Sequence, residues 1–379
     1  MSQSKNFGFG ENEAMLRDSA RRFFMDHCSA DKIHAQVAAV HDIDRSKDAV
    51  WDRELWRQIT ELGWTAACIP EAAGGVGLPA VAAVAIAEEA GRAAFPSPLL
   101  ATFCATFLLR AVANDAAMTA MQRIAAGAAA ALAISNANGS WAPAQAEVRV
   151  DANDQLSGTA YFVQDAQKVD FFVVAAINDA GLGFYAVDAG QDGVSVVADG
   201  IVDLTRDQAR VVLEGAQAIP VASGDTATRA WQAALPAILA TVSADMVGAG
   251  EWLLQTTAEY ARTRVQFDRP IGFFQAIKHP LVNVMIAIDR AKSLTYNAAC
   301  AADEEPQRAE MLARMAKSAA SDMAHFSASR AVQFHGGIGF TWECYVHLFF
   351  KRQMHSAALF GDAKLQRRHL ATLLFDQAA

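Results

Sequence analysis

The chain has 379 residues, of which 53% are hydrophobic and 19% are charged. This composition supports large buried cores and argues against a disordered protein, and the length predicts two or three structural units. The formal net charge of −9 argues against a general nucleic-acid-binding protein, because contacts to phosphates need a basic surface.

The cysteines indicate a reducing compartment. They are widely spaced and lack the paired spacing of a zinc site, so we expect small buried thiols and neither disulfides nor metal ligands. They are Cys28, Cys68, Cys104, Cys300 and Cys344. The first residues lack the basic-then-apolar order of a signal peptide, and no apolar run reaches membrane-spanning length. We therefore expect a cytoplasmic protein with no membrane partner and no metal.

Residues 1–127 carry the periodicity of helices. Apolar side chains recur at spacings of three and four residues, and the pattern breaks at a Gly-rich segment, 70–75, and a Pro-rich segment, 95–98. Between these breaks, Glu88 and Glu89 are expected to lie on a solvated helix face. The region therefore predicts an N-terminal helical domain.

Residues 128–224 change to short β-rich segments separated by turn residues. The expected strands are 131–135, 146–150, 161–163, 171–175, 184–187, 194–197 and 209–213. Because no helical pattern separates them, we expect an antiparallel sheet that forms a barrel or a sandwich.

Residues 225–379 are helical again, and Pro270, Pro280 and Pro306 are expected to punctuate the helices. The order of helical, β and helical segments predicts an α+β fold. It has an N-terminal helical domain, a middle β-barrel-like domain and a C-terminal helical bundle.

A basic and aromatic turn follows the first long helix of the C-terminal region, between Tyr260 and Gln275. Arg264 offers a guanidinium fork for a pyrophosphate, and Phe267 offers an aromatic face for stacking. The simpler alternative is a basic helix C-terminus that complements the helix dipole.

A second segment runs from Gln333 to Glu343 and contains Gly336, Gly337 and Gly339. Glycines allow a ligand to approach the backbone closely, and Gln333 supplies a polar side chain. Taken alone, a Gly-rich turn between helices is more often a simple connection.

Together and in this order, the two segments resemble the acyl-CoA dehydrogenase family. The pair Gly63-Trp64 and the stretch from Ile69 to Gly77 are similar to the family's N-terminal motif, so the resemblance covers essentially the whole chain. It implies the family's fold, whose C-terminal domain is a four-helix bundle. It also implies FAD bound at a subunit interface, and therefore an oligomer.

The resemblance assigns the cofactor contacts residue by residue. The residues expected to bind FAD are Arg264, Phe267, Gln275, Gln333, Gly336, Gly337, Phe162 and Gln164. Arg264 would contact the pyrophosphate, the Gln333 segment would close over the FAD of a neighbouring subunit, and Phe162 and Gln164 would face the isoalloxazine. Two residues depart from the family: Gln164 replaces a hydroxyl residue, and Asp268 replaces a glycine.

The catalytic base is missing from both of the places where the family carries it. The base is a carboxylate that removes the α-proton while the β-hydrogen leaves as hydride, and the matching positions here are Phe360 and Ile238. Asp245 is one substitute, because desolvation in its mostly apolar helical run is expected to raise its pKa. Its alternative role is that of a hydrogen-bonded buried carboxylate. Asp362 is the other substitute, and its alternative role is to cap the last helix.

The implied activity is the FAD-dependent α,β-dehydrogenation of an acyl-CoA thioester to the 2-enoyl-CoA, with an electron-transfer flavoprotein or a similar acceptor. The chain is expected to form a homo-oligomer or a heteromer with a homologue, like relatives that act on steroid side-chain or dicarboxylic acyl groups. Two alternatives remain. One is a non-catalytic partner that completes a homologue's FAD site, and the other is a flavin oxidase or monooxygenase on the same scaffold.

Overall fold

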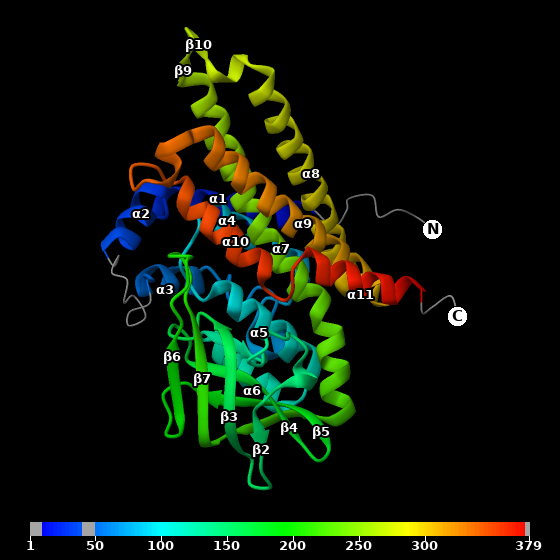
Figure 1. Cartoon of the computed structure of the whole chain (residues 1–379). Helices are drawn as coiled ribbons and strands as arrows, with labels where there is room; N and C mark the ends of the chain where they lie inside the picture. The colour runs from blue at the N-terminus through cyan, green and yellow to red at the C-terminus, as the bar shows by residue number, and fades with distance from the viewer. Residues whose placement is uncertain (1–9, 40–49, 376–379) are drawn as a thin grey trace.

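The computed structural model describes residues 10–39 and 50–375. Six helices come first, with a short 3-10 helix at Glu71–Ala73. They are α1 (Glu11–His27), α2 (Ala30–Ala39), α3 (Arg53–Glu61), α4 (Ala80–Arg92), α5 (Leu99–Val112) and α6 (Asp115–Ala125). Strands and then long helices follow, so the observed architecture is α+β in the predicted order (Figure 1).

Eight strands form one sheet at the end of the molecule opposite the β9–β10 hairpin (Figure 1). They are β1 (Ala130–Ala133), β2 (Arg149–Val150), β3 (Gln155–Gln164), β4 (Phe171–Asn178), β5 (Gly181–Asp188), β6 (Val194–Ala198), β7 (Gln208–Gln217) and β8 (Ile219–Ser223). The bonded order is β6-β7-β3-β2-β4-β5-β8, with β1 also paired to β4. The expectation of a purely antiparallel sheet was wrong, because β1 and β2 both run parallel to β4.

Five helices and a small hairpin complete the chain. They are α7 (Gly224–Thr263), β9 (Val265–Gln266), β10 (Arg269–Pro270), α8 (Gln275–Glu304), α9 (Pro306–His335), α10 (Val346–Ala358) and α11 (Ala363–Phe375), with short 3-10 helices at Pro143–Gln145, Ile271–Phe273 and Gly336–Phe340. Helices α7, α8 and α9 pack on one another, and α10 and α11 pack on α9. Pro306 begins α9, as its missing N–H favours, but Pro280 lies inside α8, where a break was expected.

Helix α7 is the spine of the fold and runs from the sheet to the β9–β10 hairpin (Figure 1). It is long and apolar enough to cross a membrane, but 94% of its most apolar 18-residue stretch is buried inside the protein. It crosses α4 at very short range, because a Cβ added to Gly248 would overlap the Glu88 carbonyl oxygen and one added to Gly91 would overlap that of Asp245. Two glycines therefore bring the backbones of α4 and α7 together.

The expectation that Glu88 and Glu89 are solvated was wrong, since they are 0% and 1% exposed. Glu88 accepts hydrogen bonds from Lys292 Nζ (2.6 Å) and Tyr296 Oη (2.7 Å), and Glu89 accepts from Arg21 Nη2 (2.8 Å). Both carboxylates thus hold α4 to neighbouring helices through paired charges, the condition under which proteins bury ionised groups.

Candidate functional site

Arg264 lies where α7 ends and the β9–β10 hairpin begins. Its backbone is fixed on both sides: its N–H donates to Tyr260 O (2.8 Å), and its carbonyl accepts from Ile271 N (2.8 Å). Its side chain is exposed, and no residue in the described part of the chain pairs with its guanidinium. A fixed backbone with free donors suits an anionic group such as a pyrophosphate.

The hairpin turn presents Phe267, which is 86% exposed. Phe267 and Asp268 both have positive φ, 53° and 59°, the pattern of a two-residue hairpin turn that usually takes glycine. Asp268 therefore keeps the turn at the place where the family uses glycine. Gln275 begins α8 close by in the sequence and is also exposed.

The second segment follows the end of α9. Gln333, Gly336 and Gly337 are exposed, and a Cβ added to Gly337 would meet nothing within 4 Å, so its backbone is open to a ligand or a partner. Gly339 has a different task, because its Cβ would press on the carbonyl oxygen of Val332 at 3.1 Å. The open backbone of Gly337 and the exposed amide of Gln333 fit a phosphate-bearing cofactor.

Helices α7 and α9 bring these two segments together. The ring of Tyr260 stacks on that of His335 with 4.3 Å between centroids. The structure therefore joins Arg264 and Gln333, which the sequence placed in one site, at the same end of the bundle. We call the surface formed by Arg264, Gln333, Gly336 and Gly337 the open half-site.

Phe162 and Gln164 lie elsewhere, on β3. The side-chain amide of Gln164 forms hydrogen bonds to other residues of the chain. Its Nε2 donates to Phe162 O (3.0 Å) and Gln208 Oε1 (2.9 Å), and its Oε1 accepts from His355 Nε2 (2.6 Å). At about 1.5 Å per helical residue, Arg264 lies about 28 Å along α7 from Asp245, which contacts the loop next to β7. Within a single chain, the two groups of predicted FAD residues therefore lie far apart, on β3 and near the β9–β10 hairpin (Figure 1).

The two positions that usually carry the base are buried and apolar. Ile238 is 0% exposed and Phe360 is 8% exposed. Phe360 has a positive φ of 52° and packs on Trp141 with 4.9 Å between ring centroids. Its carbonyl accepts from Gln366 Nε2 (2.6 Å), which fixes the loop between α10 and α11.

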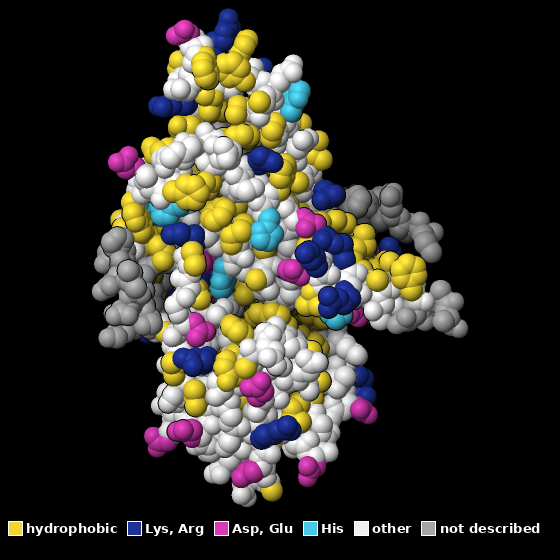
Figure 2. All heavy atoms as spheres, viewed as in Figure 1, with side chains coloured by type: hydrophobic (Ala, Val, Ile, Leu, Met, Phe, Trp, Pro, Cys, Tyr) yellow, Lys and Arg dark blue, Asp and Glu magenta, His cyan; other side chains and the backbone are white. Residues whose placement is uncertain are grey.

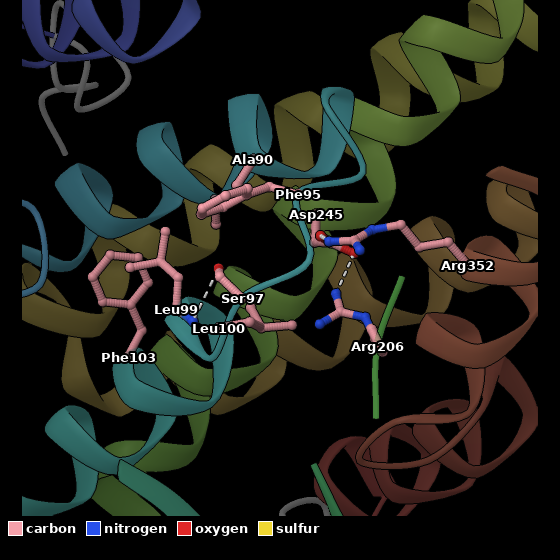
Figure 3. Close-up of a pocket in the computed structure, with 10 residues that line it drawn as sticks. Ala90, Phe95, Ser97, Leu99, Leu100, Phe103, Arg206, Asp245 and Arg352 are labelled. Carbon is pink, nitrogen blue, oxygen red and sulfur yellow. Dashed lines mark hydrogen bonds and ion pairs between the residues drawn. The ribbon is translucent and has the colours of Figure 1, made fainter. Parts of the chain in front are cut away.

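Asp245 is buried, but its surroundings are charged and not apolar. Figure 3 shows it between Arg206, next to β7, and Arg352, on α10; the N–O distances are 2.8 and 2.5 Å. Ser356 Oγ also donates to it (3.1 Å). Burial alone would raise the pKa of Asp245, but the two arginines outweigh burial and lower that pKa to about 2. The expectation of a raised pKa was therefore wrong.

Asp362 is exposed and precedes α11. Its Oδ1 accepts a hydrogen bond from Leu365 N (2.8 Å), the contact of a helix N-cap. The structure thus gives Asp362 the capping contact that was weighed as its alternative role.

Sequence reasoning missed Arg206 and Arg352. They line a cavity of about 10 Å³ between α4, α5 and α7, and Arg206 also lines an adjoining cavity of about 20 Å³ beside Gln164 and Phe360. These volumes hold about one water molecule each, so neither of these two cavities has room for a flavin ring. We call this region the closed half-site. No local motif marks the two arginines, because they meet Asp245 only through the fold.

Comparisons with known proteins identify the family. The family model described as "Acyl-CoA dehydrogenase, N-terminal domain" matches residues 10–127, and "Acyl-CoA dehydrogenase, C-terminal domain" matches residues 231–375. Acyl-CoA dehydrogenase IpdE2 of Mycobacterium tuberculosis is 31% identical over 97% of this chain and 98% of its own length.

Two solved structures are similar over nearly their whole length. The ChsE4-ChsE5 complex from Mycobacterium tuberculosis has a TM-score of 0.85 at 26% identity, covering 97% of this chain and 98% of the matched chain. The "Tcur3481-Tcur3483 steroid ACAD" variant has a TM-score of 0.86 at 25% identity, covering 97% and 99%. The fold inferred from the sequence is confirmed, and the chain belongs to the acyl-CoA dehydrogenase family of FAD-dependent oxidoreductases.

Proposed function

We propose that this chain is one subunit of a heteromeric acyl-CoA dehydrogenase, in which a homologous chain supplies the catalytic base. The complex converts an acyl-CoA thioester to the 2-enoyl-CoA. The observation that carries the proposal is the burial of Phe360 and Ile238 at the two places where the family holds its base.

Neither remaining carboxylate suits the task of a base. A general base that works near neutral pH needs a pKa near 7 and a free approach to the proton. Asp245 has a pKa of about 2 and uses both oxygens on arginine and serine side chains. Asp362 caps α11 through one oxygen and lies at the surface. The proton acceptor therefore belongs to the partner.

The two half-sites of this chain differ in how much space and how many free polar groups they offer to a cofactor. The closed half-site has room for about one water molecule in each of its cavities, and its Gln164 amide is already bonded. The open half-site has an exposed arginine, Arg264, that pairs with none of the described residues, and an unobstructed glycine backbone at Gly337. We infer that this chain completes the FAD site of its partner, which gives one FAD for each pair of chains.

Within that site, FAD supplies the acceptor for the hydride that leaves the β-carbon. The residues of this chain would hold and orient the cofactor. The Arg264 guanidinium would donate charge-assisted hydrogen bonds to the pyrophosphate, and Gln333 would offer its side-chain amide. The open backbone at Gly337 allows close approach of the cofactor or the partner.

A partner surface surrounds the open half-site. Large apolar side chains are exposed on the hairpin, the following turn and α8; they are Val265, Phe267, Phe273, Val282, Met285 and Ile286. Figure 2 shows hydrophobic side chains gathered at this end of the bundle. Contiguous exposed apolar surface marks interaction sites, and the two similar structures are each named for a pair of proteins, ChsE4-ChsE5 and Tcur3481-Tcur3483. The proposed occupant is a homologous subunit.

The test is to purify the chain alone and together with its homologous partner. We expect little or no flavin with the chain alone, and a yellow complex whose flavin is bleached by an acyl-CoA without oxygen and reoxidised by an electron-transfer flavoprotein. Rapid reoxidation by air with peroxide formation would indicate an oxidase instead. A complex without flavin, or one that no acyl-CoA bleaches, would contradict the proposal.

A further inference from the structure

The ends of α7 and α9 are joined by an aromatic pair, Tyr260 and His335. Their rings are stacked, with 4.3 Å between centroids and 21° between planes. Tyr260 Oη donates a long hydrogen bond to the carbonyl oxygen of His335 (3.5 Å). Tyr260 is half-buried and His335 is 6% exposed, so the contact lies beneath the surface of the open half-site.

The His335 ring is held in one orientation. Its Nδ1 lies 2.8 Å from Ala331 O, and because a carbonyl can only accept, Nδ1 carries the proton. Burial lowers the pKa of His335, although the bond to Ala331 O opposes this shift. The ring is therefore neutral at pH 7 and packs on the phenol ring without burying a charge.

The pair stands between the two parts of the open half-site. Arg264 follows Tyr260 by one helical turn and donates its N–H to the Tyr260 carbonyl (2.8 Å). Gln333 precedes His335 on α9, and Gly336 and Gly337 follow it. The stack thus ties the backbone that carries Arg264 to the backbone that carries Gln333 and the glycines.

We propose that Tyr260 and His335 are positioning residues, which set the spacing between Arg264 and the Gln333–Gly337 turn and so tune the affinity for FAD. This inference rests on the proposed function of the open half-site. The pair acts through Arg264 and the turn and not by touching the cofactor. A binding site loses affinity for its ligand when the residues that orient its contacting side chains are removed, even if every contacting side chain is kept.

The experiment measures the dissociation constant for FAD of the purified complex. Tyr260→Leu removes the stack and keeps apolar bulk, and we expect it to weaken binding about two- to tenfold, the usual worth of an aromatic pair. His335→Ala should act in the same direction. Tyr260→Phe and His335→Phe keep two stacked rings and should remain within about twofold of the natural complex.

A matched control comes from another stack on α7, where Trp252 packs on Phe349 with 3.7 Å between centroids. Trp252→Leu also removes an aromatic pair, but it lies about two turns before Tyr260, so FAD affinity should stay within about twofold. Melting of the flavin-free complex shows whether each variant folds.

The decisive comparison is made in an Arg264→Ala background. If the stack acts by placing Arg264, Tyr260→Leu should cost clearly less affinity there than in the natural sequence. Equal losses in both backgrounds, or natural FAD affinity in a folded Tyr260→Leu complex, would overturn the inference. If Arg264→Ala itself leaves FAD affinity unchanged, the proposed role of the open half-site fails instead.

Discussion

At the scale of single residues, the neighbours of a carboxylate decide its chemistry. Asp245 lies in an apolar stretch of sequence, which suggested a raised pKa, yet Arg206 and Arg352 reverse the sign of the shift. The sequence could not predict that these arginines pair with Asp245, because Arg206 lies in the loop before β7 and Arg352 lies on α10. The same carboxylate is therefore a clamp between three segments and a poor base.

Replacing Asp245 by Asn should destabilise the protein and spare catalysis. The substitution removes the nearest counter-charge of two buried guanidinium groups, Arg206 and Arg352, and breaking a buried ion pair in this way costs about 3–5 kcal/mol. Urea unfolding at pH 7 measures this loss. A fully stable Asp245→Asn complex that has lost several orders of magnitude in turnover, with FAD retained, would instead identify Asp245 as the base.

The same ion pairs predict a pH dependence. The pKa of Asp245 in the folded protein, about 2, is below the ordinary value of an aspartate. The ionised carboxylate therefore stabilises the fold above the unfolded pKa, and this contribution is lost as the pH falls through the folded pKa. Unfolding measured between pH 5 and 2 should show a steeper loss of stability in the natural protein than in Asp245→Asn. Parallel curves would contradict the account.

Arg264→Ala should weaken FAD binding by about tenfold or more, since a hydrogen bond to a charged group is worth about 1.5–3 kcal/mol. Arg262→Ala is the matched control, because Arg262 is exposed on the same helix end but pairs with Glu259 (3.2 Å). Titration of the flavin-free complex with FAD compares the two. Similar losses from both variants would mean that general positive charge, and not the Arg264 position, holds the cofactor.

At the scale of helices and strands, local patterns predicted which elements form but not how they pair. The apolar segments at 171–175 and 194–197 became β4 and β6 nearly as expected. Strand β8 was missed because Pro220 interrupts the strand pattern. A strand accepts proline only at a sheet edge or at an irregularity, and the pairing of β8 with β5 does shift register next to Pro220. The parallel pairing of β1 with β4 joins segments far apart in the chain, and no short-range signal encodes it.

The crossing of α4 and α7 yields a prediction about packing. Gly248→Ala would push a Cβ into the backbone of α4 at Glu88 and should destabilise the protein by about 1–3 kcal/mol or more. Gly190→Ala is the control, because a Cβ there meets nothing within 4 Å. Thermal unfolding of the two variants checks the contrast. Equal stability of both would mean that the helices separate without cost.

At the scale of the whole molecule, the 40 residues of α7 support the proposal that the cofactor site is built from two chains. A helix of this length spans about 60 Å, and it carries the open half-site at one end while its middle borders the closed half-site. The family resemblance predicted the residues of the open half-site and, next to the closed half-site, Gln164, but it did not predict Arg206 and Arg352. Only the fold shows how little space the two cavities of the closed half-site leave, because the side chains that line them come from segments far apart in the chain.

The most direct test of this account is the ratio of FAD to protein in the complex with the homologous partner, measured by flavin absorbance and followed by anaerobic reduction with an acyl-CoA. We predict one FAD for each pair of chains, fully bleached by substrate, and bleached at the same rate when Asp362 is replaced by Asn. A chain that by itself binds one FAD and reduces it with an acyl-CoA would contradict the account.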